Sequence, residues 1–268
     1  MSFQPFVIGS GLSGWAFLKS TVPMQRSAHV RSIPIASDSE YFLERFPKIH
    51  TPDDIIDDRR VMRVVLGAYG LSEDVDNRHF IKTLMMEGVS DPKALANKLA
   101  DRRYKSFARD FDFSTSRPRH LSEPGRARIT VKRFQDDAFE SAIGETRHEM
   151  RLALGFSKNI RILWKESSTN TAAWFQILAT PPLKKVLQTA LGLPPEFSRL
   201  DIDEQHRRIQ EKAWRVFGTN DISELSSDRI AEDVTRRFLI LEQAASVGKT
   251  SALQTALVIL SATPQMRV

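Results

Sequence analysis

The 268-residue sequence contains no cysteine. This absence excludes disulfide bonds, thiolate nucleophiles and zinc or iron–sulfur sites built on cysteine ligands. It is typical of a protein that works in a reducing compartment, and it is equally compatible with an exported protein that needs no disulfides. Cysteine chemistry therefore plays no part in the function.

Long apolar runs are also missing. The longest late run, residues 256–260, is far shorter than the roughly 20 residues that span a bilayer. Residues 1–18 carry no basic side chain, and Pro5, Gly9, Gly11 and Gly14 interrupt their apolar character, which argues against a secretory signal. We therefore expect a soluble protein without a membrane span or a cleavable signal.

Charge of one sign is not strongly dominant. The formal net charge is +6, with 27% charged and 41% hydrophobic residues, which lies within the range of globular proteins. A mild positive excess is compatible with an acidic partner, but it more often reflects solubility alone. The composition excludes wholesale disorder, and its wealth of Leu, Ala, Arg, Lys and Glu favours helices.

One stretch, residues 57–71, has a clear helical pattern. Its apolar side chains recur at i, i+3, i+4, i+7 and i+8: Val61, Val64, Val65, Ala68 and Tyr69. This spacing forms one stripe on an α-helix, and Gly70 stands where a left-handed residue ends a helix. The pattern returns in residues 183–193, where Gly192 takes the same place.

A second similarity extends this repetition. Residues 218–238 resemble residues 88–108 in layout, with a glycine, a polar cap region, a leucine seven residues later and a charged amphipathic continuation. Elsewhere Thr51-Pro52 predicts a helix start, residues 131–156 predict one long helix, and residues 171–178 predict another. The sequence thus predicts an all-α helical bundle built from two related multi-helix halves joined by a basic linker.

The expected domain organisation has five parts. They are a glycine- and aromatic-rich amino-terminal arm (1–40), a first helical half (41–113), a basic Pro/Ser linker (114–130), a second helical half (131–243) and an amphipathic carboxy-terminal tail (244–268).

The amino-terminal glycines leave an enzymatic alternative open. Gly9, Gly11 and Gly14 match G-x-G-x-x-G, the turn that binds pyrophosphate in FAD- and NAD-dependent oxidoreductases. The context argues against it, because the strand before the motif would be very short and Pro23 would end the following helix after about two turns. The next candidate strand, residues 29–38, contains Pro34. An arm anchored by Phe6, Trp15 and Phe17 is the preferred interpretation.

The basic linker leaves a second alternative, weak nucleic-acid binding. Its basic side chains could contact phosphates, but no aromatic residue is interleaved for base stacking, so a solvated loop is preferred. These basic residues are Arg117, Arg119, His120, Arg126 and Arg128.

No catalytic, cofactor or metal site emerges from the sequence. Glu145 and His148 have the Glu-x-x-His spacing of di-iron bundles, but such sites need a second copy, and Asp203 with His206 is a poor one. No G-x-S-x-G or H-E-x-x-H motif occurs. We expect no bound cofactor and no enzymatic activity.

Three segments together resemble a known family. They are YFLERFPKIHTPDDIIDDRRVMRVVLGAYGL (41–71), MEGVSDPKALANKLADRRYKSFARDFDF (86–113) and FQILATPPLKKVLQTALGLPPEFSRLDIDEQ (175–205). The chain resembles the alphaproteobacterial domain-of-unknown-function 1217 family, whose genes lie among flagellar genes. The resemblance implies an all-helical protein without catalytic residues and a role beside the flagellum. The lack of cysteine and of a cleavable signal is compatible both with a cytoplasmic location and with export to the flagellum without a cleavable signal.

We therefore expect a non-enzymatic accessory protein that binds another protein, possible partners being flagellar components. The residues expected to bind that partner flank the conspicuous helices or lie on the apolar stripe of the tail. They are Arg59, Arg60, Arg63, Lys184, Lys185, Leu253 and Leu257.

Overall fold

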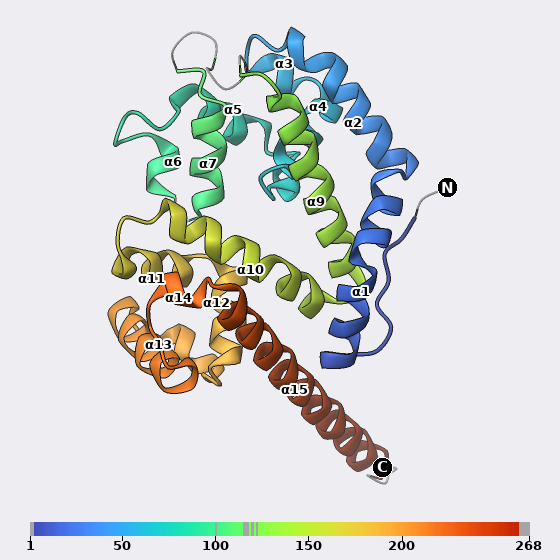
Figure 1. Cartoon of the computed structure of the whole chain (residues 1–268), viewed down its shortest axis with the longest axis vertical. Coiled ribbons are helices and arrows are strands. Elements are labelled where there is room, and N and C mark those ends of the chain that lie inside the picture. The colour runs from blue at the N-terminus through green and yellow to red at the C-terminus, as the bar shows by residue number, and fades with distance from the viewer. Residues whose placement is uncertain (1–2, 100, 115–117, 119–120, 122, 263–268) are drawn as a thin grey trace, which may run out of the picture. The chain divides into compact units, whose positions relative to one another are not determined.

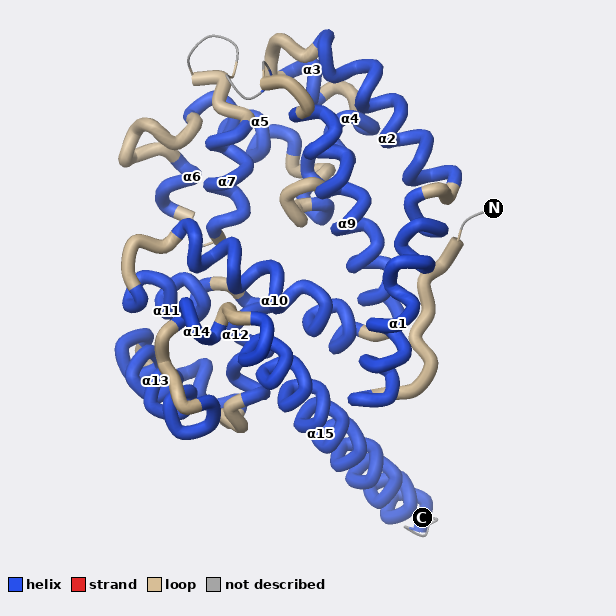
Figure 2. Tube along the Cα trace, viewed as in Figure 1, coloured by secondary structure: helices blue, strands red, loops and turns tan. Residues whose placement is uncertain are grey.

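A computed structural model of the chain is all-helical in the part it describes (Figures 1 and 2). That part comprises residues 3–99, 101–114, 118, 121 and 123–262, and for residues 248–262 only the backbone helix is described. Within it no strand occurs, which confirms the predicted fold class. None of the helices described there is long and apolar enough to cross a membrane.

The chain divides into two compact units. Unit 1 comprises residues 1–6 and 19–151, and unit 2 comprises residues 7–18 and 152–268. Two of the three boundaries fall inside helices, one in α1 (Gly11–Val30) and one in α10 (His148–Glu166), and the third lies in the segment before α1. The five-part division expected from the sequence is a different description of the chain and stays a prediction.

Unit 1 is built around the first conspicuous stretch, α4, which packs on α2, α3 and α9. Three residues of its apolar stripe, Val61, Val64 and Val65, are at most 1% exposed, and the last two, Ala68 and Tyr69, are partly buried. Gly70 adopts φ +69°, and the Leu71 N–H reaches back to the Leu66 carbonyl at 2.9 Å, which is the predicted left-handed helix end. The remaining elements of unit 1 are α2 (Ile33–Arg45), α3 (Asp53–Ile56), α4 (Arg59–Gly67), α5 (Arg78–Glu87), α6 (Leu95–Lys98), α7 (Arg102–Asp110) and α9 (Arg126–Thr146), with short 3₁₀ turns at Phe46–Lys48 and Ser72–Asp74.

Asp58 is the residue that starts α4. Its carboxylate accepts hydrogen bonds from the backbone N–H groups of Arg60 at 3.0 Å and Val61 at 3.2 Å, and from the Tyr41 hydroxyl at 2.6 Å. Burial alone would raise the pKa of this carboxyl, but the bonds from Tyr41, Val61 and Arg60 outweigh burial and hold the pKa below its usual value.

We expect Asp58→Ala to lower the free energy of unfolding by about 1–2 kcal/mol at neutral pH, because the helix loses its N-cap. A depressed pKa in the folded state stabilises the protein above the unfolded-state pKa of about 4, and this stabilisation is lost as the pH falls through the folded-state value. Urea titrations of both proteins at pH 7 and in strong acid should therefore converge in acid. A difference that is unchanged in acid would contradict the assignment.

Unit 2 is built around the second conspicuous stretch, α12, which packs most extensively on α15. Gly192 adopts φ +65°, as Gly70 does, and the Leu193 N–H bonds the Gln188 carbonyl at 2.9 Å. Helix α11 packs against α12, α13 and α14 and buries Trp174 completely. The elements of unit 2 after α10 are α11 (Asn170–Ala179), α12 (Pro181–Ala190), a 3₁₀ turn (Pro195–Arg199), α13 (Ile202–Phe217), α14 (Ile222–Leu225) and α15 (Asp228–Ala262).

Two prolines near the amino terminus have other roles than expected. Pro23 does not end a helix but lies inside α1, which continues to Val30. Pro34 does not interrupt a strand but occupies the first turn of α2, where its missing N–H costs nothing. Residues 29–38, the candidate strand of the dinucleotide-binding alternative, therefore form no strand, because the Ser32-Ile33-Pro34 signal is a helix start like Thr51-Pro52.

Two further boundaries differ from the prediction. Residues 131–156 are not one helix, because Arg147, at φ −142°, separates α9 from α10. Helix α9 begins at Arg126, directly after Gly125 at φ +78°, so the last five residues expected in the linker are helical. Thr130, one of them, is buried.

The order of elements repeats along the chain. Helix α4, a 3₁₀ turn, α5, the one-turn helix α6 and α7 are followed later by α12, a 3₁₀ turn, α13, the one-turn helix α14 and α15. Positive-φ glycines end the first and second helices of each series: Gly70, Gly88, Gly192 and Gly218. Relatedness of the two halves stays a prediction that this order supports.

Candidate protein-binding face

The arginines expected to bind a partner have acidic neighbours within unit 1. Arg60 and Arg63 both bond the carboxylate of Asp38, at 2.8 and 2.5 Å, and the Arg60 guanidinium lies 4.1 Å from the centre of the Tyr41 ring. Arg59 pairs with Asp76 at 2.9 Å. Each can help hold α4 in place, and their role in partner binding stays a prediction.

The lysines at the start of α12 are engaged in unit 2. The Lys184 ammonium donates to the Gln205 side chain at 2.8 Å, and partial burial lowers the pKa of Lys184. Lys185 pairs with Glu242 on α15 at 3.0 Å. Leu253 and Leu257 fall on the α15 backbone helix, but their side chains lie outside the described residues.

The amino-terminal glycines have a packing role in unit 2. Residues 3–8 form no strand, so the strand–turn–helix context of a dinucleotide site does not occur there. Gly11, at φ +53°, lies so close to α15 that an added Cβ would overlap the Gln243 side chain. Gln243 donates to the Ser10 hydroxyl at 3.0 Å. The motif thus provides close approach to α15.

The expected aromatic anchors of this segment differ in burial. Trp15 is 8% exposed, and its indole N–H donates to Glu232 on α15 at 3.2 Å. Phe17 is partly buried, whereas Phe6 is 48% exposed. Trp15 is therefore the anchor of this stretch on unit 2.

The weak metal motif is divided between two helices. Glu145 lies on α9 and His148 begins α10, so the regular i, i+3 geometry on one helix is absent. Glu145 accepts a hydrogen bond from Gln4 at 3.1 Å. Across the residues the structure describes, no group of three His, Asp or Glu side chains could hold a metal ion.

The structure describes only part of the basic linker. Arg117, Arg119 and His120 lie outside the described residues. Arg126 and Arg128 belong to the first turn of α9, and Arg126 pairs with Glu123 at 3.3 Å. Nucleic-acid binding through this segment thus gains no support from the residues in view.

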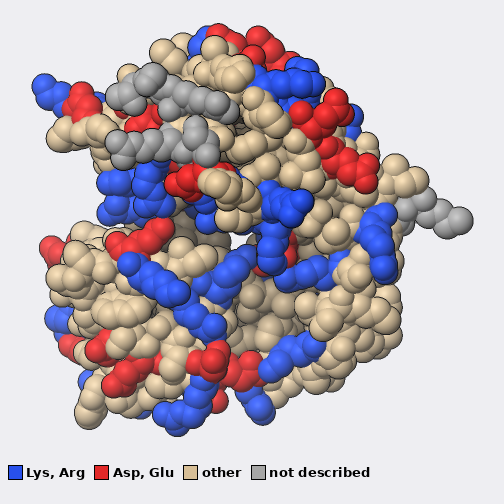
Figure 3. Space-filling view, turned by 45° about the horizontal axis from the view of Figure 1, so that its top comes forward, with Lys and Arg blue, Asp and Glu red and all other residues tan. Residues whose placement is uncertain are grey.

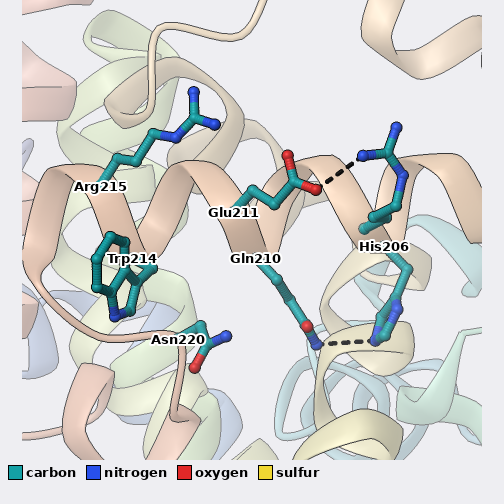
Figure 4. A pocket seen from close by; sticks show the side chains of 7 residues that line it. His206, Gln210, Glu211, Trp214, Arg215 and Asn220 are labelled. Atoms are coloured by element: carbon teal, nitrogen blue, oxygen red, sulfur yellow. Dashed lines mark hydrogen bonds and ion pairs between the residues drawn. The ribbon is translucent and has the colours of Figure 1, made fainter.

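An open depression of 450 Å³ lies along α13 in unit 2 (Figure 4). Its lining comes from one face of that helix and from the loop that follows. The lining residues are His206, Arg207, Gln210, Glu211, Trp214, Arg215 and Asn220.

The pattern of α13 explains why these side chains lie outside the core. Gln205, Ile209 and Ala213 recur every four residues and are buried against the rest of unit 2. His206, Gln210 and Trp214 have the same spacing but lie one residue further on, about 100° around the helix. They therefore form a second stripe beside the buried one.

The stripe begins with an ordered histidine. The His206 ring stacks on Phe175 of α11, with centroids 4.4 Å apart and planes 5° from parallel. The Gln210 side-chain nitrogen lies 2.9 Å from His206 Nε2. These contacts fix two members of the stripe.

Trp214 ends the stripe and is 63% exposed. Beside it, Asn220 is held through its backbone: its carbonyl accepts hydrogen bonds from Trp174 Nε1 at 2.8 Å and Asn170 Nδ2 at 3.0 Å. Asn170 Oδ1 in turn accepts from the Ile222 N–H at 2.9 Å. Helix α11 thus positions the loop that borders the indole.

The charges along α13 are mostly paired. Arg207 bonds both Glu204 and Glu211 at 2.7 Å, and Arg208 also pairs with Glu204. Hydrogen bonds from Arg208 and Arg207 lower the pKa of Glu204. Basic and acidic side chains are likewise interspersed over the face of the molecule in Figure 3.

The sequence alone did not predict this face. Its detectable signal was a tryptophan displaced from the apolar stripe of an amphipathic helix, among charged neighbours. The contribution of Asn220 had no such signal, because the hydrogen bonds that hold it come from α11, about 50 residues earlier in the chain.

Residues 68–251 match the family described as protein of unknown function (DUF1217), which covers more than half of the chain. The chain belongs to the DUF1217 family. No curated protein matches this DUF1217 chain. Its fold is similar to the crystal structure of protein AGR_C_984 from Agrobacterium tumefaciens, with a TM-score of 0.67 and 23% identity over 88% of this chain and 96% of that one.

Proposed function

We propose that this DUF1217 protein is a non-enzymatic accessory protein that binds another protein, and that it works in flagellar assembly or function. The observation that carries the binding role is the exposed Trp214 face of α13. A tryptophan that is mostly exposed and lies beside an arginine has the composition of a protein-interaction hot spot.

Two tyrosines with raised pKa values use their hydroxyl groups to connect parts of the fold. Burial and the adjacent Asp110 raise the pKa of the Tyr69 hydroxyl, which donates to that carboxylate at 2.6 Å. Burial and a hydrogen bond to Asp74 raise the pKa of Tyr104 to about 12. Both tyrosines connect neighbouring elements of unit 1, and neither lines the depression on α13.

The flagellar part of the proposal rests on the resemblance of residues 41–71, 86–113 and 175–205 to a family with flagellar gene neighbours. Deleting the gene should reduce swimming in soft agar or the number of assembled flagella, and wild-type protein should restore both. A gene copy with Trp214→Ala should restore neither, although the protein accumulates normally. Ile202→Ala, at an exposed apolar residue of the same helix, is the matched control and should restore both.

The two parts of the proposal fail separately. A deletion strain that swims normally and carries normal flagella would contradict the flagellar role. A deletion phenotype that Trp214→Ala rescues as fully as Ile202→Ala does would contradict the assignment of the binding face.

A further inference from the structure

Trp214 differs from the other tryptophans whose indole contacts are known. The indole N–H of Trp15 donates to Glu232, and that of Trp174 donates to the Asn220 carbonyl. Those two rings are 8% and 0% exposed, against 63% for Trp214. The Trp214 indole thus presents both an apolar surface and an available hydrogen-bond donor to a partner.

The charges beside the Trp214 indole determine which sign of charge a partner should carry. Arg207 and Glu211, which also line the depression, neutralise each other at 2.7 Å. No acidic side chain in the described part of the chain lies within ion-pair distance of Arg215. Its guanidinium is therefore the uncompensated charge of the depression, and it favours a carboxylate.

Asn220 adds a neutral donor and acceptor on the loop side of the indole (Figure 4). Its backbone carbonyl is occupied by α11, but its side-chain carboxamide has no hydrogen-bond partner among the described residues. The hydrogen bonds from α11 already hold the loop that carries Asn220, so ordering this loop on binding costs little conformational entropy. The site thus combines an apolar surface, one cation and one amide on a rigid support.

Resting on the proposed function, we propose that this face binds an acidic segment of a partner protein in which a large apolar side chain lies next to carboxylates. The apolar side chain packs on the Trp214 indole, and a neighbouring carboxylate pairs with Arg215 and accepts from Asn220. Nucleic acid fits this face poorly, because phosphate-backbone binding needs several uncompensated cations in a row. Here Arg207 and Arg208 are already paired with glutamates.

A dodecapeptide phage library panned on the full-length protein, with counter-selection on the Trp214→Ala variant, tests this assignment. Enriched peptides should carry a large apolar residue within two positions of Asp or Glu. Fluorescence polarisation with the most enriched synthetic peptide should show about thirtyfold weaker binding to Trp214→Ala and about tenfold weaker binding to Arg215→Glu. Lys212→Glu makes the same charge change on α13 outside the depression and should bind within about twofold of wild type.

Circular dichroism should first show that each variant is folded. Trp214→Phe, which keeps an aromatic ring, should retain part of the affinity. Basic or uncharged peptides, or equal binding by Arg215→Glu and Lys212→Glu, would overturn the proposed partner chemistry while leaving the swimming experiment unaffected. Failure to enrich any peptide that depends on Trp214 would overturn it as well. Sedimentation that shows a dimer lost in Trp214→Ala would make a second copy of this chain the occupant and would also overturn it.

Discussion

Replacing Trp174 by alanine should lower the free energy of unfolding of unit 2 by about 3–5 kcal/mol. The indole is completely buried on α11, the helix that packs on α12, α13 and α14. Removing it leaves a large cavity and also frees the Asn220 carbonyl of its 2.8 Å hydrogen bond. Urea unfolding followed by circular dichroism measures the loss.

Two matched variants separate the contributions. Trp174→Phe retains much of the apolar volume but lacks the indole donor, so its loss should be smaller than that of Trp174→Ala. Trp214→Ala removes the same side chain from an exposed position and should change the stability by no more than about 0.5 kcal/mol. Equal losses at positions 174 and 214 would mean that the burial assigned to these rings is wrong.

Replacing Gly88 by alanine should destabilise unit 1 by about 2–3 kcal/mol, because the backbone there adopts φ +60° and ψ −143°, a region that residues with a Cβ avoid. The added methyl would also overlap the Asp112 carboxylate. That carboxylate has little freedom to move away, since it accepts from the Ser114 N–H and hydroxyl, and Phe113 bonds the Met85 carbonyl of α5 at 2.8 Å.

Gly192 is the matched control for Gly88. It also has a positive φ, +65°, but an added Cβ there meets no atom within 4 Å. Gly192→Ala should therefore cost only the left-handed backbone strain, about 1–2 kcal/mol. A thermal melt in which Gly192→Ala is the less stable of the two variants would contradict the crowding described at Gly88.

The sequence pattern was sufficient for the local elements with strong periodicity. The stripes of α4 and α12 and the glycines that end them could be read directly, because helical spacing and positive φ leave signatures in single residues. The same periodicity indicated α11, which was predicted at residues 171–178. The break at Arg147 left only a weak signal, because the nearest glycine, Gly144, lies inside the last turn of α9 and no proline follows it there.

The amino-terminal segment was harder to read for a physical reason. Gly9, Gly11 and Gly14 allow another group to approach the backbone closely. The sequence does not distinguish a pyrophosphate from a protein side chain as that group. In the structure Gly11 approaches Gln243, more than 200 residues later in the chain. A contact of such separation has no local signature.

The binding face also combines features that have a local sequence signature with features that depend on tertiary contacts. The amphipathic pattern of α13 places Trp214 off the buried stripe, so its exposure was predictable in principle from residues 202–217. The sequence could not predict which basic side chains have an acidic partner. The pairing of Lys185 with Glu242, or of Arg60 with Asp38, depends on tertiary contacts. The arginines and lysines predicted to bind a partner are conspicuous in the sequence by their charge. The lack of an acidic neighbour at Arg215 among the described residues is evident only in the structure.

The central claim is that the α13 face contacts a protein in the cell. The direct measurement is photo-crosslinking in living cells with benzoylphenylalanine in place of Gln210, which lies on the face. The control places benzoylphenylalanine at Lys212, which lies on the same helix outside the depression. We expect a discrete adduct from position 210, lost when Trp214→Ala is added, and none from position 212. No adduct at 210, or the same adduct from both positions, would contradict the claim.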